Sequence, residues 1–235
     1  MALQHSPRIV TDGLIFMIDA ANPKCMQAGD TTCTDLIGAK TCTGASGTPA
    51  AGAHTPNPAY FPEYNDLYGG GVFDCAGGRG MNVEESLGSH TEVSVCTWLY
   101  KNSSSAQYIT DGRNNGGTWY IFNYTSPQTN LSWANQLTHT FSDPKEADDE
   151  AFMNKWIYLV IAADASAGTF FVNDESVATG GPITDSLGVN FRIGTRYTTS
   201  APWTGYMGPI QIYDRKITLA EVQQNFNAHR SRFGV

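Results

Sequence analysis

Short apolar or alternating runs, separated by turn residues, follow one another along the whole chain. The clearest of them lie at 14–18, 93–98, 156–163, 169–172 and 207–213. Runs of about four to eight such residues between turn signals are typical of β-strands. At 93–98 both alternating sets of side chains are largely apolar, which predicts a strand that is covered on both faces. Many short strands without helical periodicity between them predict an all-β sandwich or barrel.

Two dipeptides predict hairpin turns between these strands. Asp111-Gly112 follows the run at 108–110, and Asn173-Asp174 follows the run at 169–172. Asn, Asp and Gly supply the backbone conformations that tight hairpins require. Further short strands are expected at 119–122 and 191–193.

One helix is expected after the last apolar run. Thr218 can cap its N-terminus, and Glu221 stands three residues later, which is the pattern of a capping box. Val222 and Phe226 fall on one face of such a helix. We expect the helix to run to about His229.

The stretch at about 22–71 differs from the rest of the chain because it is rich in Gly, Ala, Thr and Pro. Loops of this length usually carry a function or form an interface. The sequence shows no linker and no internal repeat. We therefore expect one domain over 1–235, with a long ordered loop insertion at 22–71.

The charge balance narrows the classes of partner. Charged residues make up 15% of the chain and the net charge is −8. An acidic chain is a poor partner for a phosphate backbone, so we expect no nucleic-acid binding. A surface built from Ser, Thr, Asn, Gln and Gly instead suits contact with a glycan or a permanent protein interface, where desolvating charges is costly.

Targeting and redox signals are weak. The first ten residues lack the features of a signal peptide, and no apolar run approaches the roughly 18 residues of a membrane-spanning helix. We expect no membrane partner and synthesis in a cytoplasm. The odd count of five cysteines then indicates reduced thiols. The spacing of Cys25, Cys33 and Cys42 does not favour a zinc site, and the sequence leaves open whether this cluster oxidises.

Several segments, taken together and in order, resemble one known family. They are "DGLIFMIDAANPKC" (12–25), "GGVFDCAGGRGMNV" (70–83), "EVSVCTWLY" (92–100), "NKWIYLVIAAD" with "GTFFVNDE" (154–175), and the closing segment at 203–235. They are similar to the concanavalin A-like, laminin-G-like jelly roll in the form found in tailed-phage structural proteins. The closing segment is the most specific, with its Tyr-Asp-Arg turn, terminal helix and Arg-Phe-Gly tail.

The resemblance implies a two-sheet antiparallel jelly-roll sandwich with six or seven strands in each sheet and one short C-terminal helix. It also implies a structural role in the virion, since such domains decorate heads, fibres or baseplates. Because the domain fills the chain, we expect a capsid decoration protein that binds the major capsid protein or other virion proteins. A symmetric homo-oligomer, most simply a trimer, fits the symmetry of a phage head.

The same superfamily includes glucanases, but the chain is not expected to be an enzyme. The glucanase signature places three acids on one face of a strand. Glu146, Asp148 and Glu150 match its residue types and spacing. Ala147 and Asp149 between them leave no opposing apolar face. Four acids in this short stretch, just after a turn signal, indicate a solvated loop.

A calcium site is a weak possibility. Laminin-G-like domains often hold calcium at one rim, and Asp111, Asn114 and Asn115 offer the oxygen ligands that calcium prefers. A plain hairpin turn is the favoured interpretation, because Asp and Asn are common in turns for their own reasons. We expect no other cofactor.

Carbohydrate binding requires exposed aromatic side chains beside amide or charged groups. Arg113, Asn114 and Trp119 form one candidate group, and Tyr197 and Trp203 form another. The alternative is that the two tryptophans fill the core or its rim, as large aromatic residues usually do. The same residue types also mark protein interfaces, so a lectin-like receptor or glycan binder of the tail or fibre remains the second hypothesis.

Overall fold

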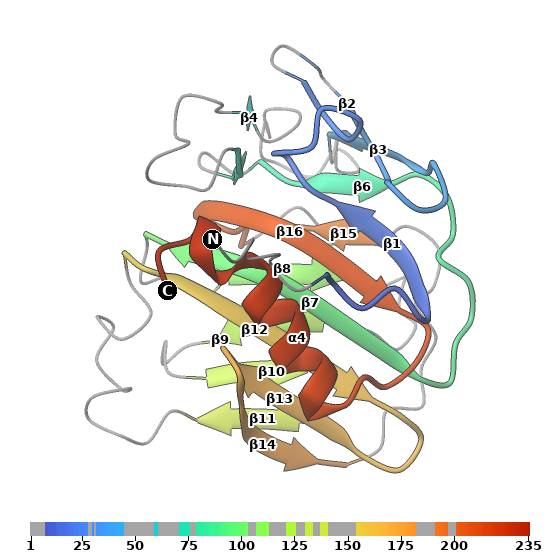
Figure 1. Cartoon of the computed structure of the whole chain (residues 1–235), viewed down its shortest axis with the longest axis vertical. Coiled ribbons are helices and arrows are strands. Elements are labelled where there is room, and N and C mark those ends of the chain that lie inside the picture. Colours follow the sequence, from blue (N-terminus) through green and yellow to red (C-terminus); the bar gives the residue numbers. More distant parts are fainter. Residues whose placement is uncertain are drawn as a thin grey trace, which may run out of the picture.

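Two antiparallel sheets and one C-terminal helix make up the described part of the chain in the computed structural model (Figure 1). The structure describes residues 8–27, 30, 32–44, 59–60, 71–75, 79–102, 107–112, 121–125, 130–133, 137–140, 154–181, 191–196 and 201–235. No helix in these ranges is long and apolar enough to cross a membrane.

Sheet A contains the first and the last strand of the sequence. Its order is β14-β13-β12-β7-β16-β5-β4, and β1 pairs with the remaining length of β16. The strands are β14 (Glu175–Gly180), β13 (Gly168–Val172), β12 (Trp156–Ala163), β7 (Val93–Lys101), β16 (Gly205–Tyr213), β5 (Phe73–Asp74), β4 (Ala59–Tyr60) and β1 (Leu14–Ile18).

Sheet B lies behind sheet A in Figure 1 and has the order β11-β10-β9-β8-β15-β6-β3-β2. Each sheet has eight strands in the described residues. The strands of sheet B are β11 (Leu137–Thr140), β10 (Asn130–Trp133), β9 (Ile121–Thr125), β8 (Gln107–Asp111), β15 (Arg192–Ile193), β6 (Met81–Val83), β3 (Thr41–Gly44) and β2 (Thr32–Thr34).

Sheet A is the middle of three layers. Alternate side chains of β7 point to opposite faces, because successive residues of a strand do so. Val95 and Leu99 belong to the core between the two sheets, whereas Cys96 and Trp98 belong to a second core under the helix. The predicted strand covered on both faces is therefore confirmed, and the second core explains it.

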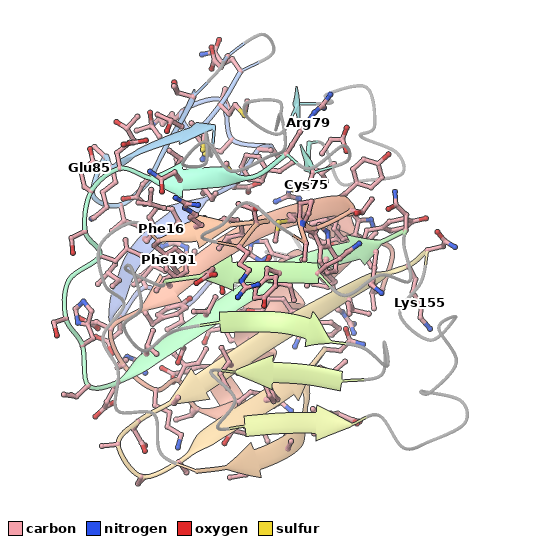
Figure 2. The ribbon with its side chains drawn as sticks, turned by 180° about the vertical axis from the view of Figure 1, so that it is seen from behind. Phe16, Cys75, Arg79, Glu85, Lys155 and Phe191 are labelled. Atoms are coloured by element: carbon pink, nitrogen blue, oxygen red, sulfur yellow. The ribbon has the colours of Figure 1, made fainter. Side chains whose placement is uncertain are left out.

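The first core joins residues from both sheets. Phe16 of β1 and Phe191, which precedes β15, are fully buried members of it (Figure 2). Their aromatic rings fill the space between sheets that are too far apart for small side chains to meet.

The second core is closed by helix α4 (Leu219–His229) and the following turn of 3₁₀ helix, η2 (Arg230–Arg232). The Trp98 ring stacks on Phe226 at 5.5 Å and on Phe233 at 4.5 Å between ring centroids. Gly208 of β16 permits this packing, because a Cβ there would lie 2.7 Å from the Phe233 ring and 2.8 Å from Cβ of Trp98.

The N-terminal segment is tied to the helix by a closed set of buried hydrogen bonds. Asn225 of α4 accepts from the Val10 backbone N–H at 2.8 Å and donates to the Tyr213 hydroxyl at 2.9 Å. That hydroxyl donates to the Val10 carbonyl at 3.0 Å. Arg232 adds a two-pronged ion pair to Asp19, at 2.8 and 3.1 Å. Segments from both ends of the described chain therefore cover the same face of sheet A.

The predictions of the helix and of the two hairpin turns have different outcomes. The sandwich with one short C-terminal helix is confirmed, including the capping box of Thr218 and Glu221. The Asn173-Asp174 hairpin is confirmed, with Asn173 at a φ of +57°. The two-residue turn at Asp111-Gly112 is wrong, because Asp111 ends β8 and its partner strand β9 begins only at Ile121.

The predicted loop insertion at 22–71 contains regular structure. Strands β2, β3 and β4 lie within it, and the first two form a hairpin at the edge of sheet B. The prolines at 49, 56, 58 and 62 lie outside the described residues.

Candidate functional site

A row of polar side chains crosses the outer face of sheet B. Its members are directly paired residues of neighbouring strands. Residues directly opposite each other in neighbouring strands share a face of the sheet. Their immediate neighbours in sequence, among them Cys33, Cys42 and Ile193, point into the core between the sheets. The row, called the polar row below, consists of Thr32, Thr43, Asn82, Arg192 and Asp111.

The polar row spans five adjacent strands. At a strand spacing of about 4.8 Å, its four steps cover about 19 Å. Figure 2 views the molecule from the side of sheet B, which carries this face. Asp111 at the β8 end is fully buried, so an extended ligand can contact the row from Thr32 to Arg192, which is three steps or about 14 Å.

Arg192 is the central charge of the row. It is half-buried, and desolvation lowers the pKa of its guanidinium while the nearby Asp111 carboxylate opposes that shift. Nη1 of Arg192 also donates to the Arg196 carbonyl, at 3.4 Å. The guanidinium is thus partly exposed on this face, and a charge-assisted hydrogen bond from it to an added ligand would be stronger than one between neutral groups.

An aromatic ring lies beside the row. Tyr108 faces outward from β8, since its neighbour Ile109 belongs to the core. The Arg196 guanidinium lies 5.4 Å from the centre of the Tyr108 ring. The Tyr108 backbone N–H donates to the Ala201 carbonyl at 3.0 Å, which fixes the strand here.

The other half of the row is organised by Glu84. Its Oε1 accepts from the Thr43 hydroxyl and, at 3.2 Å, from Nδ2 of Asn82. Oδ1 of Asn82 is buried and has no hydrogen-bond partner among the described residues. The row therefore combines amide, hydroxyl and guanidinium groups with a neighbouring aromatic ring, the groups that recognise hydroxylated ligands.

Trp203 is the one tryptophan of the predicted glycan site that the structure describes, and it corrects that prediction. Its side chain is 2% exposed and packs in the core between the sheets. The aromatic surface is therefore not available for stacking on a sugar. The alternative interpretation, a core residue, fits this position.

Of the remaining predicted site residues, the structure describes Asp111 of the weak calcium candidate, which is fully buried at the end of β8. The others lie outside the described residues. The described residues contain no group of three or more His, Cys, Asp or Glu that could hold a metal ion. The residues outside the description are Arg113, Asn114, Asn115, Trp119 and Tyr197, together with the acids Glu146, Asp148 and Glu150.

The polar row is not among the sites predicted from the sequence. Arg192 stands between Phe191 and Ile193, so a polar side chain alternating with buried ones was visible in the sequence. Its alignment with Asn82 and Asp111 depends on strand pairing between distant segments, which the alternation alone does not reveal.

The layers and the polar face define a lectin-like β-sandwich. Residues 76–223 match the family model of the concanavalin A-like lectin/glucanases superfamily. That match covers more than half of the 235 residues, so the chain belongs to this superfamily. Comparison with curated protein sequences gave no match.

Solved structures share the fold at low sequence identity. Domain 4 of AbnA, a GH43 extracellular arabinanase from Geobacillus stearothermophilus in complex with arabinotriose, is 14% identical, with a TM-score of 0.65 over 90% of this chain and 97% of that chain. The binding domain of Paraclostridial Mosquitocidal Protein 1 is 12% identical, with a TM-score of 0.61 over 92% of this chain and 52% of that one.

Trypanosoma rangeli sialidase is also similar, at 12% identity and a TM-score of 0.58. The alignment covers 97% of this chain but 36% of the sialidase chain. At these identities the likeness shows a common fold.

Proposed function

We propose that this chain is a non-catalytic binding protein of a tailed-phage particle, attached to the capsid surface as a decoration protein through protein–protein contacts. It would act there as a homo-oligomer, most simply a trimer, in contact with the major capsid protein.

The observation that carries the proposal is the closing segment at 203–235. This is the stretch with the most specific resemblance to phage structural proteins, and it builds β16, α4 and η2. Phe233, from the Arg-Phe-Gly tail, is 5% exposed and packs on Trp98 and Trp156. The resemblance therefore rests on residues that build the third layer of the fold.

The surface composition supports attachment by contact. Only 15% of the residues are charged, so a large interface can form with little desolvation of charge. The outer face of sheet B, with its hydroxyl and amide groups, is the described face that best fits such an interface.

The test is the copy number of this chain in purified particles, measured by quantitative mass spectrometry against the major capsid protein. Hundreds of copies per particle support decoration of the shell. A handful of copies would place the chain on the tail and favour the second function below. Its absence from particles would overturn the virion proposal.

The second candidate function is recognition of a host-surface glycan. The polar row with Tyr108 favours it, and the similar arabinanase domain was solved with arabinotriose. Arg192→Ala should lower the affinity for a bound glycan at least about tenfold, which corresponds to about 1.4 kcal/mol. Arg230→Ala is the matched control, because Arg230 is exposed on the helix layer at the other side of sheet A. Equal binding by both variants would remove the polar row as the glycan site.

The absence of catalysis is part of the proposal. We expect no hydrolysis of β-glucans by the purified protein. A measurable hydrolysis that Glu146→Gln abolishes would show a glucanase instead. We also propose that no resident cofactor is needed, so that adding calcium or a chelator leaves the melting temperature unchanged.

A further inference from the structure

Three cysteines from consecutive segments meet at the edge of sheet B. Cys33 and Cys42 are directly opposite each other in the β2–β3 hairpin. The Thr34 backbone N–H donates to the Cys25 carbonyl at 2.8 Å, so Cys25 lies along the side of β2 that faces away from β3. Cys33 is therefore the middle member of the cluster.

All three side chains are buried in the same core. The Cys33 thiol donates to Sδ of Met81 at 3.6 Å, and its neighbours Cys25 and Cys42 both raise the pKa of Cys33. The three cysteines are 4%, 2% and 0% exposed and all are free thiols. Directly opposite residues of an antiparallel pair have Cα atoms about 5 Å apart, which is within the range that a disulfide bridges.

We propose that Cys25, Cys33 and Cys42 form an oxidisable cluster, in which Cys33 makes one disulfide with either neighbour and the third cysteine stays a thiol. Because Cys33 stands between the other two, every disulfide inside the cluster includes it. Among the described residues, no group of three or more His, Cys, Asp or Glu is placed to hold a metal ion.

The order of the steps follows from the hydrogen bonds. The hydrogen bond from Cys33 lowers the pKa of Cys25, and the Asp19 backbone N–H, 3.4 Å from the Cys25 sulfur, acts in the same direction. The neighbouring thiols of Cys25 and Cys42, and then burial, raise the pKa of Cys33. Cys25 is thus the thiolate that attacks first, since the thiolate is the nucleophile in disulfide exchange.

The oxidant is a low-molecular-weight disulfide such as oxidised glutathione. The Cys25 thiolate attacks one of its sulfurs, which forms a mixed disulfide and releases one small thiolate. Cys33 then loses its proton to that thiolate and attacks the Cys25 sulfur, releasing the second thiolate. Two protein thiols become one disulfide and the oxidant becomes two small thiols. Attack by Cys42 on Cys33 can afterwards move the bond to the hairpin pair.

The position of the cluster makes the reaction accessible. β2 is the last strand of sheet B, with one strand neighbour in the described residues. Edge elements open locally at a lower free energy than central strands, so a small disulfide can enter without global unfolding. Cys96 is fully buried in β7 and belongs to the second core, and Cys75 is fully buried directly after β5 of sheet A.

The experiment compares wild type, Cys33→Ala and Cys75→Ala after native protein is incubated with oxidised glutathione. Thiols are counted after denaturation, and disulfide-linked peptides are mapped without reduction. Wild type should fall from five thiols to three, and Cys75→Ala should lose two thiols in the same way. Cys33→Ala should form no disulfide between protein cysteines and lose at most one thiol, as a mixed disulfide of Cys25 with glutathione. The linked peptides of wild type should always contain Cys33.

Two results would overturn the proposal. One is a wild-type protein that keeps all five thiols under these conditions. The other is a linked peptide pair that joins Cys25 to Cys42, or that involves Cys75 or Cys96. If Cys33→Ala does not fold, the peptide map of the wild type decides alone.

Discussion

Replacing Asn225 by Ala tests whether the buried hydrogen bonds hold the N-terminal segment on the helix. Asn225 is fully buried, and its amide bonds both the Val10 N–H and the Tyr213 hydroxyl. In the variant the Val10 N–H is buried without an acceptor, which costs about 1–3 kcal/mol. The Tyr213 hydroxyl loses a donor, at about 1 kcal/mol, although it still donates to the Val10 carbonyl.

Helix propensity acts in the opposite direction. Ala is more favourable than Asn inside a helix by roughly 0.6 kcal/mol. The net loss in the free energy of unfolding should therefore be about 1.5–3.5 kcal/mol. Urea unfolding followed by tryptophan fluorescence measures it, with the slope of the transition unchanged if only stability is affected.

Asn227→Ala is the matched control in the same helix. Asn227 is exposed, and its side chain donates only to the Gln223 carbonyl one turn earlier, at 2.8 Å. This substitution should leave the free energy of unfolding unchanged or raise it slightly, because Ala has the better propensity. If Asn225→Ala falls within about 0.5 kcal/mol of Asn227→Ala, the reasoning about the buried amide is refuted.

Three further substitutions probe separate parts of the fold. Gly205→Ala should cost at least about 3 kcal/mol in unfolding free energy or prevent folding. The reason is that Gly205 has a φ of +136° and a Cβ would lie 2.0 Å from the Tyr100 carbonyl oxygen. Gly181→Ala, whose Cβ would meet no atom of the described residues within 4 Å, should be neutral in the same denaturation assay. Burial, with help from Arg232, lowers the pKa of His229 from 6.5 to about 4. The unfolded chain therefore binds a proton that the folded chain does not as pH falls through this range, and roughly 3 kcal/mol of stability should be lost between pH 6.5 and 4. His229→Gln should show a correspondingly flatter pH dependence, and identical profiles would contradict the assignment. Phe233→Ala should cost about 3–5 kcal/mol, since it empties the space against Trp98 and Trp156, whereas a loss below about 1 kcal/mol would mean that the tail does not close the second core.

Local sequence signals predicted the elements well where short-range chemistry decides them. The strands at 14–18 and 156–163 and the capped helix follow from apolar runs and a capping box, and each stands at its expected place. The turn at Asp111-Gly112 failed because its residues suit several structures. Asp111 is buried in a strand that pairs with Arg192, a contact between segments far apart in the sequence.

The candidate site was harder to predict than the fold. Trp203 has the residue type of a sugar-stacking side chain, yet its burial is set by packing between the sheets. The polar row depends on the register of five strands, and register is a property of the pairing as a whole. Composition predicted a polar, weakly charged surface, and the row at Asn82 and Arg192 is an example of it.

The pairing of β1 with β16 has a consequence for how the chain is synthesised. Leu14 is opposite Tyr213, so β1 cannot form its strand pairing until β16 has been synthesised. At a ribosomal rate of about 5–20 residues per second, roughly 10–40 s pass between the synthesis of the two strands. During this time the apolar β1 has no strand to pair with and no helix above it, since α4 is made later still. Until then the unpaired apolar strand is open to pairing with another copy of the chain, so aggregation during synthesis is the expected failure of this topology.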